Sequence, residues 1–433
     1  MRIKERKTRR LIVVSLDAMG SGDFEWAARM PGFAKVLERA AFCKNVSSIY
    51  PSLTYPAHTT IVTGRLPARH GIINNTLLQP ERTSPDWYWQ RRFIRGTTLY
   101  DEAAKAGMTT AALLWPVTGG AGITWNMPEI FANRPWSSQI TTSLYNGSKY
   151  YQFDLNRRFG HLRNGKAQPD LDHFTQASLL YTLEKYRPDL TLAHLTDLDT
   201  QKHHFGNRSI EARDALKRHD GRISQLLAVM DSCGMDTDKD TTLILLGDHS
   251  QLDIGRPVLI NRLLADSHLL TAEKGRISRW RAICKHCDGS AYIYLNREGL
   301  APDRIRALEL QVKHLLTAAA DRPGSGIRTL YTGAEAGALG ADPDCFMMLE
   351  AETGCYFQDV MDEADLTDRE KATHGYHPGR KGYETVFMIL GPDIRRGYEI
   401  PHMTLADEGP VMAALLGLDL GRTDGRIPEG LFM

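Results

Sequence analysis

Side chains of the kinds that bind metal ions recur along this chain in segments that could converge on one site. The carboxylates and imidazoles concerned are Asp17, Asp199, His203, Asp248, His249 and His374. Each aspartate follows, directly or nearly, a short strand-like apolar run: LIVVSL, LTLAHLTDL and TTLILLG. If three carboxylates and three imidazoles meet, they need compensating positive charge, which two divalent cations would supply. The pattern therefore predicts an enzyme with two metal ions.

The spacing within two pairs of these residues suits shared binding of a cation. Asp199 and His203 lie four residues apart, so on a helix that starts just after a strand their side chains point the same way. Asp248 and His249 are adjacent, and we expect them to converge in a sharp turn after LLG. His374 precedes Gly375, in a loop whose backbone could approach a ligand closely. A single Asp or His is usually solvated or locally hydrogen-bonded, so the prediction depends on the combination.

Strand-like and helix-like segments alternate over residues 10–255, which predicts a doubly wound α/β sheet. Residues 106–116 are strand-like, and residues 209–234 have helical apolar spacing that ends at Gly234. The apolar runs before the three aspartates are typical of buried parallel strands. Because open α/β sheets build their sites at the carboxyl ends of such strands, the aspartates should meet at one edge of the sheet.

The pattern changes between about residue 256 and residue 370. A strand (AYIYL), a helix over 304–320, a strand over 327–332, a short helix (GAEAGALG) and a strand over 345–357 predict a small α+β insertion. The chain then returns through THGYHPG, a strand over 384–391 and a helix over 407–417. We therefore predict a metal-binding catalytic domain of residues 1–255 and 371–433, with residues 256–370 as a cap-like subdomain.

Composition limits the partners of the protein. Its 433 residues carry a formal charge of +1, so nothing indicates nucleic acid or a membrane surface as a partner. The first ten residues hold six basic side chains, which we interpret as a solvated arm rather than as a site for an anionic partner. LIVVSL is too short for the apolar core of an export signal, and no run approaches the length of a transmembrane helix. The sequence does not indicate an oligomeric state.

Six scattered cysteines are typical of reduced thiols in a cytoplasmic protein. Cys284 and Cys287 form a CxxC pair within residues 279–295, a run that we predict to be a strand. No second pair stands at zinc-finger spacing, so ordinary packing is favoured over a zinc or redox role.

The metal-binding segments, in this order, resemble the alkaline phosphatase superfamily and, within it, the nucleotide pyrophosphatase/phosphodiesterase branch. The resemblance extends from Asp17 to the closing segment ADEGPVMAALLGLDLGRTDGR. It implies an alkaline-phosphatase-like three-layer α/β sandwich with a mainly parallel central sheet. It also implies two zinc ions, although manganese or iron could occupy the same ligands. One zinc would be bound by Asp199, His203 and His374, and the other by Asp17, Asp248 and His249, with Thr54 reaching it through its hydroxyl.

Thr54 lies in PSLTYPAHTTIVTG, after a proline-led turn and before an apolar helix-like run. On the residues alone, a role as the cap of that helix outweighs a catalytic one, although a helix N-terminus also suits a phosphoryl oxygen. The resemblance implies the catalytic role, because the nucleophile of the family is the Thr or Ser of this segment and zinc lowers the pKa of its hydroxyl. Asn75, in ARHGIINN, is either a turn residue or, as the resemblance implies, an amide donor to a non-bridging phosphoryl oxygen.

The reaction that the resemblance implies is cleavage of phosphodiester or pyrophosphate bonds through a covalent phosphothreonine, with nucleotide-type small molecules as substrates. LLWPVTGG resembles the WP-containing stretch of the diesterase branch and lacks the Arg or Lys that monoesterases add. A phosphomonoesterase, a phosphonate hydrolase or a metal-dependent phosphomutase of the same superfamily remain alternatives, as does a catalytically silent binding protein. A sulfatase is disfavoured because PSLTYPAH lacks the Cys/Ser-x-Pro-x-Arg context.

Three aromatic residues are candidates for contact with the substrate. Tyr55 occupies a position where the family carries an aromatic that can stack on a nucleobase, and packing in the core is the alternative. Trp87 and Trp89 lie in DWYWQRRFIR, a segment whose residue types suit stacking and phosphate contact. A surface loop that its own aromatics pack down is an equally good interpretation.

Overall fold

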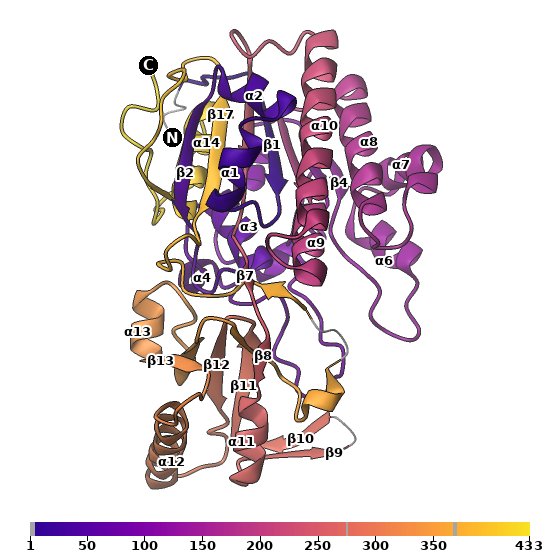
Figure 1. Ribbon diagram of the computed structural model, residues 1–433. Coiled ribbons are helices and arrows are strands. Elements are labelled where there is room, and N and C mark those ends of the chain that lie inside the picture. The colour runs from indigo at the N-terminus through magenta and orange to yellow at the C-terminus, as the bar shows by residue number, and fades with distance from the viewer. Residues whose placement is uncertain (1–4, 274–275, 367–369) are drawn as a thin grey trace.

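An eight-stranded sheet forms the centre of the computed structural model, which describes residues 5–273, 276–366 and 370–433 (Figure 1). Its strands, in spatial order, are β18 (Met403–Thr404), β2 (Ala41–Ser47), β17 (Thr385–Leu390), β6 (Thr241–Leu246), β1 (Arg10–Leu16), β5 (Leu190–Leu195), β3 (Thr110–Leu113) and β4 (Trp125–Met127). Neighbouring strands are parallel except at β17, which runs antiparallel to both β2 and β6. The predicted mainly parallel α/β sheet is confirmed.

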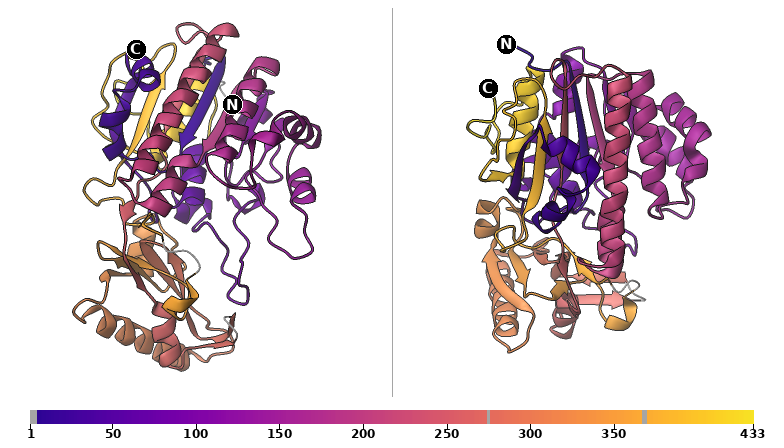
Figure 2. Two further views of the ribbon diagram at one scale, coloured as in Figure 1. Left: turned by 45° about the vertical axis from the view of Figure 1, so that its right-hand side comes forward. Right: turned by 45° about the horizontal axis from the view of Figure 1, so that its top comes forward.

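Alternate residues of the central strands enter two separate cores, which makes the fold three-layered. In β1, Leu11 and Val13 pack with helices α3 (Thr54–Thr63), α5 (Leu99–Lys105) and α14 (Glu408–Leu416). Ile12, Val14 and Leu16 pack with helices on the opposite face: α1 (Ser21–Ala27), α2 (Pro31–Leu37), α7 (Lys149–Phe159), α8 (Asp170–Lys185) and α10 (Ile210–Ser232). Figure 2 shows the sheet between these layers, with α14 in yellow on one side and α10 in rose on the other. Burial on both faces explains why these strands are continuous apolar runs.

The helix predicted over 209–234 and the strand predicted within 106–116 are present as α10 and β3. Ser209 caps α10 by accepting a hydrogen bond from the backbone N–H of Ala212, and Gly234 follows the helix with a φ of +66°. Strand β3 is shorter than the run over 106–116 that predicted it, because residues 106–109 connect α5 to the sheet.

Residues between β6 and β17 build a second, smaller sheet that lies below the central one in Figure 1. Four antiparallel strands follow the order β11 (Ala282–Cys287), β12 (Ser290–Leu295), β14 (Met347–Ala351) and β13 (Ile327–Thr332). Helices α11 (Ile260–Asp266) and α12 (Pro302–Ala320) cover it, α13 (Gly333–Ala338) follows β13, and β8 (Arg256–Val258) pairs with β15 (Cys355–Phe357). The boundaries at residues 256 and 370 remain a prediction, and residues 274–275 and 367–369 lie outside the described residues.

Two strand predictions in this region are wrong. The run over 279–295 is a hairpin rather than one strand, because Asp288 turns the chain with a φ of +58° and Gly289 follows it. The run over 345–357 is two strands, β14 and β15, separated by a turn. Cys284 and Cys287 lie on β11 in two different hydrophobic clusters, in agreement with the predicted packing role.

The basic N-terminal segment is not a free arm over residues 6–10. Arg6 pairs with Asp189 at 3.0 Å and Arg10 with Asp240 at 2.8 Å, and Thr8 is buried. The prediction of a solvated arm is therefore wrong for these residues, since acidic groups at the ends of neighbouring strands bind them. Residues 1–4 lie outside the described residues. In the described part of the chain, no helix has both the length and the apolar character to cross a membrane.

Candidate functional site

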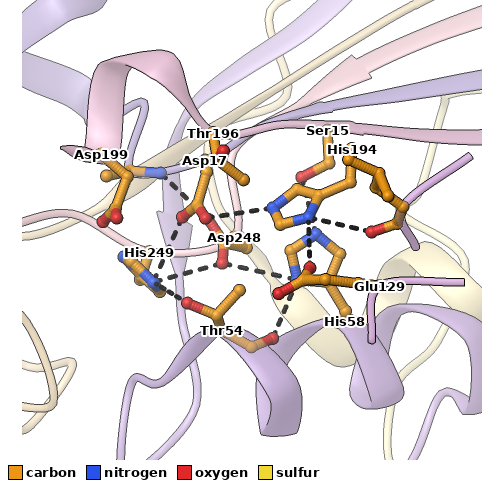
Figure 3. Close-up of polar contacts among 12 residues, drawn as sticks. Ser15, Asp17, Thr54, His58, Glu129, His194, Thr196, Asp199, Asp248 and His249 are labelled. Carbon is orange, nitrogen blue, oxygen red and sulfur yellow. Dashed lines mark hydrogen bonds and ion pairs between the residues drawn. The ribbon is translucent and has the colours of Figure 1, made fainter. Parts of the chain in front are cut away.

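The carboxyl ends of β1, β5 and β6 bring their polar side chains together at one edge of the central sheet (Figure 3). Asp17 directly follows β1, and Asp248 and His249 follow β6. Helix α9 (Asp197–Phe205) starts after β5 and carries Asp199 and His203. His374 follows the short strand β16 (Ala372–Thr373), which the chain reaches on its return from the insertion.

Asp17, Asp248 and His249 form one candidate metal site, because their ligand atoms lie within 4.8 Å of one another. His249 Nε2 is 3.5 Å from Asp17 Oδ1 and 3.2 Å from Asp248 Oδ2. Both carboxylate oxygens are buried and, among the described residues, have no hydrogen-bond partner. Buried acceptors without a donor are costly, so these atoms fit a bound cation.

Asp199, His374 and the shared His249 form a second candidate group of the same dimensions. The rings of His249 and His374 stack with their centroids 4.1 Å apart. His203 is outside this group in the structure, but its Nε2 lies 3.4 Å from Asp199 Oδ1, as the spacing of four residues on a helix predicts. Its Nδ1 faces Glu370 Oε2 at 3.3 Å, and carboxylates commonly orient metal-binding histidines in this way.

In each of the three aspartates one oxygen is held by a hydrogen bond. His194 Nε2 lies 3.0 Å from Asp17 Oδ2, the Ala18 backbone N–H donates to Asp248 Oδ1 at 3.1 Å, and Gln251 Nε2 donates to Asp199 Oδ1 at 2.5 Å. The aspartates after β1 and β6 therefore each present their other oxygen to the site. This arrangement pre-orients carboxylates for a metal ion.

The aspartates crowd negative charge into a buried space. Burial, followed by the charge of Asp199, raises the pKa of Asp17, and burial followed by the charge of Asp17 raises the pKa of Asp248. Burial opposes ionisation of Asp199 as well, but the His203 imidazole lowers the pKa of Asp199. The charged neighbours that influence these carboxyls most are other carboxylates and imidazoles. A divalent cation would relieve this repulsion, so the donor set fits the implied metal ions.

Thr54 is the first residue of α3, yet its side chain does not cap the helix. The capping position belongs to Leu53, and no side-chain hydrogen bond caps it. Thr54 Oγ1 instead lies 3.1 Å from His249 Nε2, while its carbonyl accepts a hydrogen bond from His58 Nδ1 at 2.8 Å. His58 Nε2 in turn lies 2.9 Å from Ser15 Oγ, and burial lowers the pKa of His58. The geometry therefore turns the Thr54 hydroxyl toward the candidate metal site.

Asn75 lies beside the N-terminus of α3. Its Oδ1 accepts a hydrogen bond from the backbone N–H of Tyr55 at 2.9 Å. Fixing the oxygen in this way also fixes the direction of the amide N–H₂ group, the one that could donate to a substrate.

The three aromatic candidates pack mainly with one another and with nearby loops. Tyr55 is fully buried, its ring centroid is 5.1 Å from that of Trp87, and its hydroxyl donates to Glu129. Trp89 is buried against Phe131. The geometry favours the packing interpretation for Tyr55 and Trp89, because neither ring is free to stack, and leaves Trp87 partly exposed.

Buried charges hold the start of α9. Arg218 Nε and Nη2 donate to the two oxygens of Asp197 at 2.7 and 2.8 Å, and Arg222 adds a third contact. On the other face of α9, Lys202 Nζ donates to the carbonyl of Ala18 at 2.8 Å, in the loop that carries Asp17. These contacts attach α9 both to α10 and to the end of β1.

Sequence reasoning missed the residues that support the candidate ligands. His194, Gln251 and Glu370 contact these ligands directly. Glu129 contacts His194, and Lys202 contacts the loop that carries Asp17. His194 Nε2 meets Asp17 and its Nδ1 meets Glu129 Oε2 at 3.2 Å. Although burial favours the neutral ring, hydrogen bonds to the two carboxylates raise the pKa of His194. A histidine near the carboxyl end of a largely apolar strand was the available signal.

Comparison with known proteins agrees with the predicted resemblance. The sequence profile of the family described as type I phosphodiesterase / nucleotide pyrophosphatase matches residues 11–336. The chain is 24% identical over 271 residues to human ectonucleotide pyrophosphatase/phosphodiesterase family member 1, a match that covers 59% of this chain and 25% of that protein. It is 27% identical over 256 residues to a venom phosphodiesterase of Macrovipera lebetinus, covering 56% of this chain and 26% of that protein. The matches thus span about a quarter of the length of these relatives.

A solved structure shares the fold over nearly the whole chain. It is that of murine ectonucleotide pyrophosphatase / phosphodiesterase 5, as an inactive threonine-to-alanine variant in complex with AMP. The TM-score is 0.68 at 19% sequence identity, and the alignment covers 96% of this chain and 97% of the other. The expected alkaline-phosphatase-like fold is confirmed.

Proposed function

The chain is an enzyme of the type I phosphodiesterase / nucleotide pyrophosphatase family, and from this premise we propose that it hydrolyses phosphodiester or pyrophosphate bonds in nucleotide-type small molecules. The observation that carries the proposal is the position of the Thr54 hydroxyl, 3.1 Å from His249 Nε2 and not engaged as a helix cap. The same His249 Nε2 lies 3.5 Å from Asp17 Oδ1 and 3.2 Å from Asp248 Oδ2, two buried oxygens that lack a hydrogen-bond partner among the described residues. Relatives that bear the name phosphodiesterase, and a structural neighbour that binds AMP, support the substrate class.

Two divalent cations, with zinc as the expected identity, would complete this site. Asp17, Asp248, His249 and the Thr54 hydroxyl would hold one of them. Asp199, His203 and His374 would hold the other, and a mixed set of carboxylates and imidazoles suits zinc. When bound, the ions would lower the pKa of coordinated hydroxyl groups and neutralise phosphoryl charge.

Thr54 Oγ1 is the proposed nucleophile. It forms a bond to phosphorus as the bond from phosphorus to the leaving oxygen breaks, and the proton of the hydroxyl is balanced by protonation of the leaving oxygen. With a diester substrate, the resulting phosphothreonine still carries the other ester group. Water then attacks the same phosphorus in a second in-line displacement, one of its protons restores the Thr54 hydroxyl, and the phosphate monoester is released. The amide of Asn75, held through its Oδ1 by Tyr55, would donate to a non-bridging oxygen throughout.

The charge of the site favours a diester over a monoester. The groups that act most strongly on the site carboxyls are carboxylates and imidazoles, and Trp115, from the LLWPVTGG segment, packs against the His58 ring instead of offering a charge. A neutral amide can stabilise one phosphoryl oxygen but does not balance the extra negative charge of a monoester. We therefore propose diester or pyrophosphate cleavage ahead of the phosphomonoesterase and phosphonate hydrolase alternatives.

The test compares a nitrophenyl nucleotide diester with the matching monoester in the presence of zinc, with Thr54→Ala as the background control. The diester should have the higher kcat/KM. A monoester preference of tenfold or more, about 1.4 kcal/mol of transition-state free energy, would overturn the assignment to diesters. Turnover no greater than that of Thr54→Ala on either compound would favour a silent binding protein.

We also propose that the protein works in the cytoplasm. All six cysteines, four of which lie on strands, are free thiols, and five of them are buried. Free thiols persist in a reducing compartment.

A further inference from the structure

A series of polar side-chain contacts, made by residues other than the proposed metal ligands, leads from Asp17 toward the surface of the site. His194 is the next-to-last residue of β5, and its side chain is only 1% exposed. Its Nε2 lies 3.0 Å from Asp17 Oδ2, and its Nδ1 lies 3.2 Å from Glu129 Oε2 (Figure 3). Glu129, with a side chain that is 24% exposed, is the most exposed of these three residues.

The neighbours of His194 leave its ring one orientation. Nδ1 donates, because the Leu114 carbonyl, 3.3 Å away, can only accept. Nε2 faces Asp17 Oδ2, which accepts when Asp17 is ionised to bind a cation. The His58 ring packs against it with the centroids 4.3 Å apart, and His58 is itself held by Thr54 and Ser15. A ring flip would place carbon atoms opposite these oxygens, at the cost of leaving the buried Asp17 Oδ2 unpaired.

Glu129 links this pair to the other end of the site. Its Oε1 accepts a hydrogen bond from the Tyr55 hydroxyl at 3.2 Å. The backbone N–H of the same Tyr55 donates to Asn75 Oδ1. A set of contacts therefore runs from the aspartate at the end of β1 through Tyr55 to the amide of Asn75 beside the N-terminus of α3.

We infer that His194 and Glu129 are positioning residues that hold Asp17 in the orientation required for metal binding. His194 occupies Oδ2 of Asp17, so Oδ1, which has no hydrogen-bond partner among the described residues, is the oxygen that turns to His249 and the cation. Without this donor both oxygens could rotate, and the carboxylate would have to be ordered when the ion binds. The inference rests on the proposed two-metal function and adds to it the residues that orient one of the two sites.

Gln251 supplies a matched comparison for the other site. Its amide donates to Asp199 Oδ1 at 2.5 Å, so Gln251 contacts a proposed ligand of one ion as His194 contacts a proposed ligand of the other. His194 should therefore affect the site of Asp17, and Gln251 the site of Asp199.

The experiment measures zinc binding to the metal-free protein by competition with a chromogenic chelator, so it does not depend on turnover. In His194→Leu we expect one of two binding steps to weaken by about 10–100-fold while the other stays within about threefold. His194→Gln should recover most of the loss, because its amide nitrogen lies the same number of bonds from the backbone as Nε2. Gln251→Leu should weaken the other step, and the double variant should weaken both.

Two results would overturn the inference while leaving the proposed function intact. One is a folded His194→Leu protein that binds both ions as the wild type does. The other is a His194→Gln protein that binds no better than His194→Leu, which would indicate a role in packing alone. If His194→Leu does not fold, Glu129→Leu replaces it, with an expected weakening of one step by about tenfold and no change in affinity as the contrary result. A wild-type protein that binds no divalent ion would refute the proposed function itself.

Discussion

Replacing Thr54 by alanine separates a structural role of this residue from a chemical one. Because the side chain does not cap α3, the change removes only one methyl group, a hydroxyl and its contact with His249. Burial of a methyl group is worth about 0.8 kcal/mol, and a typical hydrogen bond about 1 kcal/mol. We therefore expect Thr54→Ala to lose about 1–2 kcal/mol of the free energy of unfolding, which leaves the protein folded.

The loss of activity should be far larger than the loss of stability. Without the nucleophile, kcat/KM for a nitrophenyl nucleotide diester should fall at least about 10⁴-fold, equivalent to ~5.4 kcal/mol of transition-state stabilisation. Thr54→Ser keeps the hydroxyl and should retain substantial activity. Thr60→Ala is the matched control, since Thr60 is a buried threonine of the same helix whose hydroxyl contacts His70 at 3.0 Å. It should cost similar stability and leave turnover unchanged.

Activity, unfolding midpoint and metal content are to be measured on the same preparations. Turnover of Thr54→Ala within tenfold of the wild type, with both metal ions present, would remove Thr54 from the mechanism. The configuration at a chiral phosphorus gives an independent check. Two in-line displacements retain it, so inversion would indicate direct attack by water and would refute the phosphothreonine.

Three further outcomes follow from the same geometry. Elemental analysis should find close to two divalent ions per chain, and His374→Ala should keep about one; an active wild type free of metal would contradict the proposal. Gly375→Ala should cost about 3–4 kcal/mol in denaturant unfolding and weaken zinc binding, because φ is +82° and a new Cβ would meet a backbone oxygen at 1.7 Å. Gly382→Ala, with a φ of +74° and open space, is its control and should cost about 1 kcal/mol with zinc binding unchanged. Although burial opposes it, hydrogen bonds from Arg218 lower the pKa of Asp197 to about 2, so this carboxylate contributes about 2 kcal/mol that is present above pH 4 and lost toward pH 2. Acid unfolding of Asp197→Asn should lack this part of the pH dependence, and an unchanged profile would contradict the assignment.

Features that depend on neighbouring residues could be predicted from the sequence. Strands β1, β5 and β6 are apolar runs buried on both faces, and the carboxyl ends of such strands hold Asp17, Asp248 and the start of α9. The distance between Asp199 and His203 follows from one turn of helix. The sheet edge that gathers these side chains was therefore predictable in outline.

Features that depend on distant parts of the chain were not predictable. The contact between His194 and Glu129 joins residues that are 65 apart in sequence, so no local sequence pattern predicts it. The burial of Tyr55 depends on loops that close over α3. In the sequence, residues 6–10 resemble a free basic arm, because their partners Asp189 and Asp240 are far away along the chain. Only the folded sheet brings these acidic residues close.

The position of β17 has a consequence for how the protein is made. This strand is among the last in the chain, yet it lies between β2 and β6 in the middle of the sheet. Until its residues leave the ribosome, β2 and β6 each expose an unpaired edge, of the kind that pairs with other chains. A nascent chain that ends before Thr385 would already carry all the proposed metal ligands without a closed sheet to hold them. Synthesis of the insertion lengthens that exposed interval, so assembly of the whole site waits for one short, late segment.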